Sequence, residues 1–194
     1  MPRLSSRDLW TKKIQGDPVP QRGREIVPLG RSYEGFVLGV DPSLRGTGIA
    51  LLEFASGGSM KLVESKTVSM PSRVSMADCL GAIYEAVDAV LEKSEPGHVS
   101  MEQTIFVQNV KVAQILGAAR GAAMAAASRR SWPVFEYAPL RIKQSVVGHG
   151  RAAKSQVART LMQLLGHAEV LPPDEADAAG AAMCHAATFK VRSK

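Results

Sequence analysis

The stretch FVLGVDPSLRGTG, Phe36 to Gly48, decides how the rest of the chain is interpreted. An apolar run of strand length ends in an acid, Asp41, and the chain then breaks at Pro42 and Gly46. A lone carboxylate at the end of a buried strand costs free energy unless something pairs with it. The stretch therefore predicts a buried first strand whose terminal acid has a partner elsewhere in the fold.

Further apolar runs predict a mixed α/β domain. IALLEF and KLVESKTVSM follow turn signals and predict two more strands, which indicates a meander. Apolar residues between Met76 and Leu91 recur at steps of three and four, the period of an amphipathic helix. HVSMEQ and PVFEYA predict a fourth and a fifth strand, and helices are expected over residues 108–130, 140–147 and 152–165 and from about 174. The order βββαβαβ, then helices, predicts a mixed five-stranded sheet with helices on both faces.

The composition fits a single domain in a reducing compartment. The chain has 194 residues, 45% of them hydrophobic, which is enough for one domain with a sizeable core. Cys79 and Cys184 lie far apart and match no zinc spacing, so free thiols are expected. The chain contains no apolar run of 18 residues and no signal-peptide pattern, so no membrane span and a cytoplasmic location are expected. The net charge of +6 is compatible with a nucleic-acid partner but supports one only weakly.

Residues 1–34 differ from the rest of the chain. They are polar, contain several prolines and show no sustained period, which predicts an irregular arm before a folded domain over residues 35–194. The excess of Lys and Arg in the arm fits either contact with DNA phosphates or an ordinary solvated tail, and the tail is the favoured interpretation. Import into an organelle through this arm stays open as an alternative.

Four carboxylates occur where elements end or begin. Asp41 ends the first strand and Glu102 the fourth, so both lie at one edge of the sheet if these strands are parallel neighbours. Asp174 and Asp177, spaced i to i+3, share a face at the start of the last helix. Singly, each acid could be a turn, capping or surface residue, but together they suit ligation of Mg²⁺ or Mn²⁺. Glu175 points to another face of that helix and is expected to be solvated.

Four segments strongly resemble the RuvC family of Holliday-junction resolvases. They are FVLGVDPSLRGTG, SMEQTIFVQNVKVAQILGAARG, WPVFEYAPLRIKQSVVGHGRAAKSQV and PPDEADAAGAAMCHA, and the resemblance runs from Phe36 to about Thr188. It implies an RNase H-like fold and a homodimer that cuts two strands of a four-way DNA junction during recombination and repair at the nucleoid. A branch-migration helicase complex is a candidate partner. The resemblance assigns the catalytic, metal-binding role to Asp41, Glu102, Asp174 and Asp177, with two Mg²⁺ ions per site and Mn²⁺ as a substitute.

The resemblance also implies DNA contacts. Lys143 and Lys154 match the family's basic residues near the scissile phosphate, and solvated helix residues are the alternative interpretation. Arg45, in the turn after the first strand, is a further candidate for DNA contact. His149, in a Gly-flanked loop, could touch phosphate but is equally well explained as a plain loop residue.

A wedge that enters the junction is the least defined of these sites. Some family members carry an aromatic residue three positions past the glutamate, and here that position is Ile105. Phe106 follows it. Our hypothesis is that Phe106, more than Ile105, enters the junction, where an apolar or aromatic side chain gains by filling an unstacked step. The alternative is that Phe106 is a core residue.

Gly117 and Gly121 stand four apart in an Ala-rich helix. This face could pack tightly on the sheet or could form a subunit contact.

Three competing functions come from other classes. An acetate-kinase-like or Hsp70-like ATPase also starts with a strand, an acid and a Gly-containing loop, but it needs two such domains. A pre-ribosomal RNA processing nuclease would share the RNase H-like fold, but the long match after Pro133 argues against it. A non-catalytic junction-binding module is disfavoured because all four acids are present.

Overall fold

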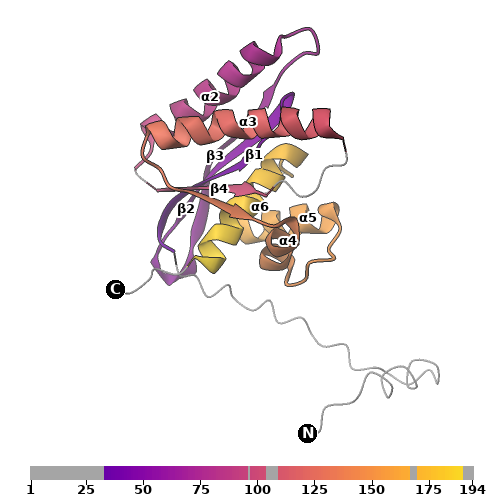
Figure 1. Ribbon diagram of the computed structural model, residues 1–194. Helices are drawn as coiled ribbons and strands as arrows, with labels where there is room; N and C mark the ends of the chain where they lie inside the picture. The colour runs from indigo at the N-terminus through magenta and orange to yellow at the C-terminus, as the bar shows by residue number, and fades with distance from the viewer. Residues whose placement is uncertain (1–32, 96, 104–108, 167–169, 190–194) are drawn as a thin grey trace, which may run out of the picture.

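A computed structural model of the chain describes residues 33–95, 97–103, 109–166 and 170–189 (Figure 1). Five strands form one sheet in the order β3-β2-β1-β4-β5. The strands are β1 (Gly35–Asp41), β2 (Gly46–Phe54), β3 (Met60–Ser69), β4 (His98–Glu102) and β5 (Val134–Tyr137). The helices are the short 3-10 helix η1 (Ser56–Gly58), α2 (Met76–Lys93), α3 (Val110–Arg129), α4 (Pro139–Val147), α5 (Lys154–Leu165) and α6 (Pro173–Thr188). The predicted order of strands and helices is confirmed.

The sheet mixes antiparallel and parallel pairs. β1 pairs with β2 and β2 with β3 in antiparallel fashion, as the predicted meander requires. β1 pairs with β4 in parallel, with Val40 opposite Met101, and β4 pairs with β5 in parallel. The two acids that follow Val40 and Met101 therefore reach the same edge of the sheet.

Helices cover both faces of the sheet (Figure 1). Leu38 and Val40 of β1 pack in one core with buried residues of α2 and α3. Val37 faces the other way, into a second core built with α5 and α6. Because successive side chains of a strand alternate between faces, Asp41 lies on the α6 side of β1.

Helix α6 lies against the sheet at glycine positions. A β-carbon added at Gly48 of β2 would lie 2.0 Å from the carbonyl oxygen of Asp174. One added at Gly39 of β1 would lie 1.8 Å from the carbonyl oxygen of Ala178. Only residues without a side chain allow the helix backbone to come so close to the strands.

Polar contacts hold the rest of α6 to the sheet. The hydroxyl of Ser100 in β4 donates to the carbonyl of Ala181 over 2.7 Å. Further along, the buried imidazole of His185 hydrogen-bonds to His98 of β4 and to Tyr137 of β5, each over 2.8 Å. Burial lowers the pKa of His185 to about 3, with a smaller contribution from His98, so this imidazole is neutral at pH 7.

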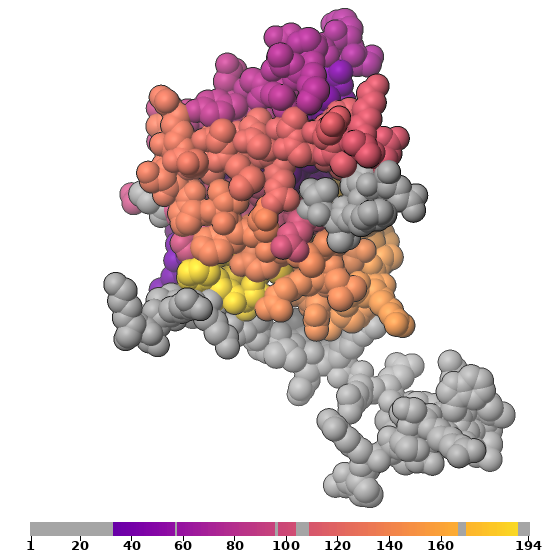
Figure 2. Space-filling model, in the orientation of Figure 1, coloured from indigo at the N-terminus to yellow at the C-terminus, as the bar shows by residue number. Residues whose placement is uncertain are grey.

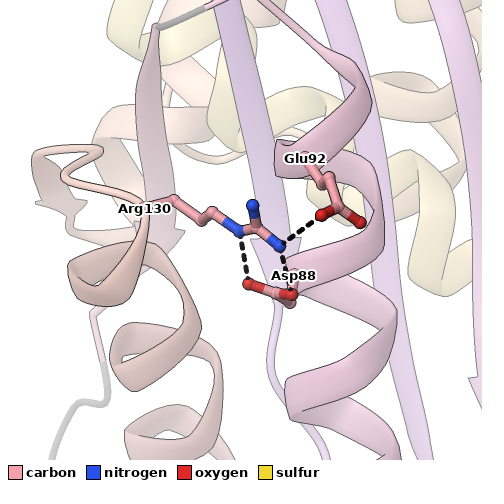
Figure 3. A network of polar contacts seen from close by, with 3 residues as sticks. All are labelled: Asp88, Glu92 and Arg130. Carbon is pink, nitrogen blue, oxygen red and sulfur yellow. Dashed lines mark hydrogen bonds and ion pairs between the residues drawn. The ribbon is translucent and has the colours of Figure 1, made fainter.

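On the opposite face, an ion-pair network joins α2 to the end of α3 (Figure 3). Arg130 donates from Nε and Nη2 to both carboxylate oxygens of Asp88, each over 2.7 Å. Its Nη2 also lies 3.0 Å from Glu92. The hydrogen bonds from Arg130 hold the pKa of Asp88 below its usual value. A two-pronged contact of this kind fixes the orientation of the two helices more than it adds stability, because the groups are partly exposed.

One part of the predicted arm belongs to the folded domain. Tyr33, assigned to the arm from the sequence, is only 8% exposed. Its ring packs 4.6 Å from that of His98 and 5.6 Å from that of Phe189, measured between centroids. Its hydroxyl donates to the carbonyl of Phe36. The sequence placed the start of the domain too late because a single aromatic residue gives no periodic signal. Residues 1–32 lie outside the described part of the chain.

The prediction of free thiols is confirmed. Cys79 and Cys184 are both buried free thiols. Within the described residues, every helix is too short or too polar to cross a membrane.

Replacing Gly39 by Ala is expected to destabilise the protein by about 1–3 kcal/mol, because the new methyl group would overlap the carbonyl oxygen of Ala178. Gly81→Ala in α2 is the matched control, since an added β-carbon there has no other atom within 4 Å. That variant should gain about 0.5–1 kcal/mol from a better helix former. Urea unfolding measures both, and equal stabilities of the two variants would contradict the close contact.

Candidate active site

Four carboxylates meet at the carboxyl edge of the parallel strands. Asp41 and Glu102 are the last residues of β1 and β4, and the first two turns of α6 supply Asp174 and Asp177. Gly48 is the cross-strand partner of Asp41 and lies under the backbone of Asp174, so α6 begins directly over this edge. Three elements that are distant in sequence therefore bring the predicted acids into one neighbourhood.

A cavity of about 150 Å³ opens between these elements. Acids from β1, β4 and α6 form one side, and α4 and α5 supply two lysines and an apolar wall. The lining residues are Asp41, Glu102, Pro139, Ile142, Lys143, Lys154, Val157, Ala176, Asp177 and Gly180. The cavity is thus acidic at the sheet edge and basic toward α4 and α5.

The electrostatics of the cavity centre on Asp41. Burial, together with the negative charges of Asp177, Glu102 and, least, Asp174, raises the pKa of its carboxyl to about 7. The ammonium of Lys154 acts in the opposite direction. In a carboxyl with a pKa this far above its usual value, the ionised form is destabilised, and binding of either a proton or a cation relieves this.

Glu102 and Lys154 respond to the same charges. The pKa of Glu102 is raised by burial and then by Asp177, while Lys154 and Lys143 lower it. Lys154 donates from Nζ to Oδ2 of Asp177 over 2.7 Å, and this hydrogen bond together with the surrounding acids raises the pKa of the ammonium. Lys154 therefore supplies a positive charge to the acids through its ion pair with Asp177.

The donor set suits a hard divalent cation. Carboxylate oxygens are the protein ligands that Mg²⁺ and Mn²⁺ prefer. Within the described ranges, no three Asp, Glu, His or Cys side chains already form a group that could hold an ion. The fit of the site to a metal thus rests on the chemistry of its donors and on the raised pKa of Asp41.

Residues 37–185 match the family described as crossover junction endodeoxyribonuclease RuvC. The chain belongs to the RuvC family. It is 37% identical over 153 residues to the RuvC of Alkaliphilus oremlandii, covering 78% of this chain and 93% of that protein. It is 43% identical over 151 residues to the RuvC of Anaeromyxobacter sp. strain K, covering 78% and 80%. The fold superposes on Thermus thermophilus RuvC in complex with a Holliday junction substrate with a TM-score of 0.75 and 30% identity, covering 79% of this chain and 93% of that one.

The structure brings both candidate lysines to the cavity. Lys143 is on α4 and Lys154 is the first residue of α5, and both line the cavity. The other two basic candidates are absent from the lining of the cavity. Arg45 donates to the carbonyl of Pro71 over 2.7 Å and to Sγ of Cys79 over 3.2 Å, so its guanidinium holds the turn before α2. DNA contact by any of these residues stays a prediction.

His149 is absent from the residues that line the cavity. His149 lies between α4 and α5, and its Nε2 is buried without a hydrogen-bond partner among the described residues. Ile105 and Phe106 lie outside the described residues, so the choice between them stays a prediction.

The prediction that Glu175 is solvated was wrong. Its side chain is only 9% exposed, and its carboxylate accepts hydrogen bonds from Ser65 and Thr67 of β3. Sequence spacing correctly placed it on another face from its acidic neighbours. It could not show that β3 passes beside that face, since this depends on how α6 crosses the sheet.

Asp41→Asn is expected to stabilise the metal-free protein at pH 8. The raised pKa means that ionising Asp41 costs folding free energy progressively between about pH 4 and pH 7, and the neutral amide avoids this cost. The gain should be on the order of 2–4 kcal/mol at pH 8 and close to zero at pH 4. Urea unfolding in EDTA at both pH values measures it. A gain of the same size at both would show that the charge of Asp41 is not the cause.

Proposed function

We propose that the chain is an endonuclease that resolves four-way DNA junctions by Mg²⁺-dependent hydrolysis of phosphodiesters. The observation that supports this is the convergence of three carboxylates, Asp41, Glu102 and Asp177, and two lysines on one cavity in a chain of the RuvC family. Asp174 is absent from the cavity lining but lies close enough for its charge to raise the pKa of Asp41. A relative with 30% identity is solved in complex with a Holliday junction substrate. Recombination and repair of DNA, with a branch-migration helicase as a partner, are the proposed setting.

Asp41, Glu102, Asp174 and Asp177 are the proposed ligands of two Mg²⁺ ions, for which Mn²⁺ can substitute. When bound, the ions supply Lewis-acid stabilisation of the phosphate's negative charge and make a water molecule more acidic. The acids contribute fixed negative charge that attracts the cations. Because burial and repulsion raise the pKa of Asp41 to about 7, its carboxyl can hold a proton until cations arrive.

The basic side chains have a complementary proposed role. Lys143 and Lys154 line the same cavity as the acids, and Lys154 is hydrogen-bonded to Asp177. A phosphate entering the cavity would meet their ammonium groups. Arg45 and His149 are proposed as secondary DNA contacts. Phe106, or its neighbour Ile105, is proposed to enter the junction centre, where stacking on a base is worth about 1–3 kcal/mol.

A homodimer through α3 is the proposed assembly. An added β-carbon at Gly117 or Gly121 would meet no other atom within 4 Å, so these glycines do not serve packing on the sheet. Val110 and Val112 at the start of α3 are 70% and 43% exposed. In Figure 2 the α3 segment crosses this face of the molecule uncovered. A second copy packed against α3 would cover this apolar and small-residue face.

Cleavage of a synthetic four-way junction tests the proposed activity. In Mg²⁺ the protein should nick this junction and leave duplex and single-stranded controls intact. Asp41→Asn should abolish detectable cleavage yet bind the junction as tightly as the unmodified protein, because affinity comes mainly from phosphate contacts. If the Asn variant cleaves at the normal rate, Asp41 is not a catalytic residue. Junction binding without any cleavage by the unmodified protein would favour a non-catalytic module.

The salt dependence of junction binding tests the lysines. If each contacts one phosphate, Lys143→Ala and Lys154→Ala should each lower the slope of log K against log salt by about one unit. Lys93→Ala, at the exposed end of α2, is the control and should leave the slope unchanged. If both slopes equal that of the control, neither lysine contacts a phosphate, and both are solvated helix residues.

A further inference from the structure

Glu175 is a buried carboxylate between the proposed metal ligands Asp174 and Asp177 in sequence. Only 9% of the residue is exposed. The hydroxyl of Ser65 donates to Oε2 over 2.6 Å, and that of Thr67 donates to Oε1 over 3.1 Å. Both donors lie on β3, the edge strand, so each carboxylate oxygen of Glu175 is held by the sheet.

This arrangement is costly to form. A carboxylate removed from water loses far more hydration than two neutral hydroxyls replace, and no Lys or Arg forms an ion pair with Glu175 among the described residues. The positive end of the α6 dipole offsets part of that cost, since Glu175 lies in the first turn. What the carboxylate adds is two directional hydrogen bonds, of which the one from Ser65 is short, and both are sensitive to the rotation of the helix about its axis.

Apolar packing by itself specifies that rotation poorly. The buried side of α6 consists mostly of Ala and Gly, and it meets the sheet at Gly39 and Gly48, which offer no side chains to interlock. Smooth surfaces of small residues allow a helix to turn or slide with little change in contact. Directional contacts must therefore fix the helix. Ser100 and His185 supply them from the middle of α6 to its far end, and Lys154 of α5 bonds to Asp177. The hydrogen bonds of Glu175 are the ones that tie the side chains of the first turn to the sheet.

We propose that Glu175 is a positioning residue that sets the rotation of the first turn of α6 and thereby aims Asp174 and Asp177 at Asp41 and Glu102. The inference rests on the proposed function, since it takes these four acids as the metal ligands. Loss of the Glu175 contacts should loosen the first turn and weaken metal binding while leaving the DNA-binding surface in place.

Titration of the protein with Mn²⁺, followed by electron paramagnetic resonance in the absence of DNA, tests this directly. Glu175→Ala should raise the Mn²⁺ dissociation constant by about tenfold, as loss of an outer-shell partner typically does. Glu175→Gln should stay within about twofold, because the amide keeps an acceptor and the hydroxyls of Ser65 and Thr67 can also accept. Glu64→Ala, an exposed carboxylate on the same strand, is the matched control and should bind Mn²⁺ normally.

A second variant covers the case in which Glu175→Ala does not fold. Ser65→Ala combined with Thr67→Val removes both donors from β3 and should also raise the Mn²⁺ dissociation constant by about tenfold. Junction binding in EDTA and urea unfolding show whether each variant is folded. The Mg²⁺ concentration for half-maximal cleavage should rise in parallel, with most of the rate recovered at saturating Mg²⁺.

The outcomes separate this inference from the proposed function. If the unmodified protein binds no Mn²⁺, or if Asp41→Asn binds it equally well, the proposed metal site itself is wrong. If the unmodified protein binds Mn²⁺ and Asp41→Asn does not, the metal site stands. A folded Glu175→Ala variant, or the folded Ser65–Thr67 double variant, with the unmodified protein's affinity would then overturn the positioning role alone.

Discussion

The close approach of α6 to the sheet is the constraint on which the rest of the site depends. The helix backbone lies where a side chain at Gly39 or Gly48 would overlap it. This lets the first turn of α6 begin directly beside Asp41, the cross-strand partner of Gly48. With larger residues at the two glycines, the helix would have to move away from the strands, and the acids of α6 would move with it.

Because α6 lies so close to the sheet, its acids repel Asp41, and a nearby lysine offsets this repulsion only in part. Three acids raise the pKa of Asp41 on top of its burial, and Lys154 opposes them from α5. Like charges held together in a poorly solvated place destabilise the fold and favour binding of cations. The same residues therefore reduce stability and supply the negative charge that favours a cation at this edge of the sheet.

The helices on the two faces of the sheet are held in place by different kinds of contact. On one face, α2 and α3 form a conventional apolar core, and Arg130 fixes them to each other through Asp88 and Glu92. On the other face, α6 is held by backbone proximity and by polar contacts near both ends, from Glu175 and His185. These directional contacts to α6 lie on the face that carries the carboxylates, where a small displacement of the helix would move Asp174 and Asp177.

The sequence by itself determined the order of elements, the strand ends that carry Asp41 and Glu102, and the acidic start of the last helix. These features are local, since period, turn residues and spacing express them within a few positions. Only the tertiary structure decided that Glu175 is buried against β3, that Tyr33 packs in the core, and that Gly117 and Gly121 face away from the sheet. Each of these depends on which distant segment lies opposite a given face. No local pattern encodes that, because it is fixed by the path of α6 across five strands and by the packing of helices on both sides.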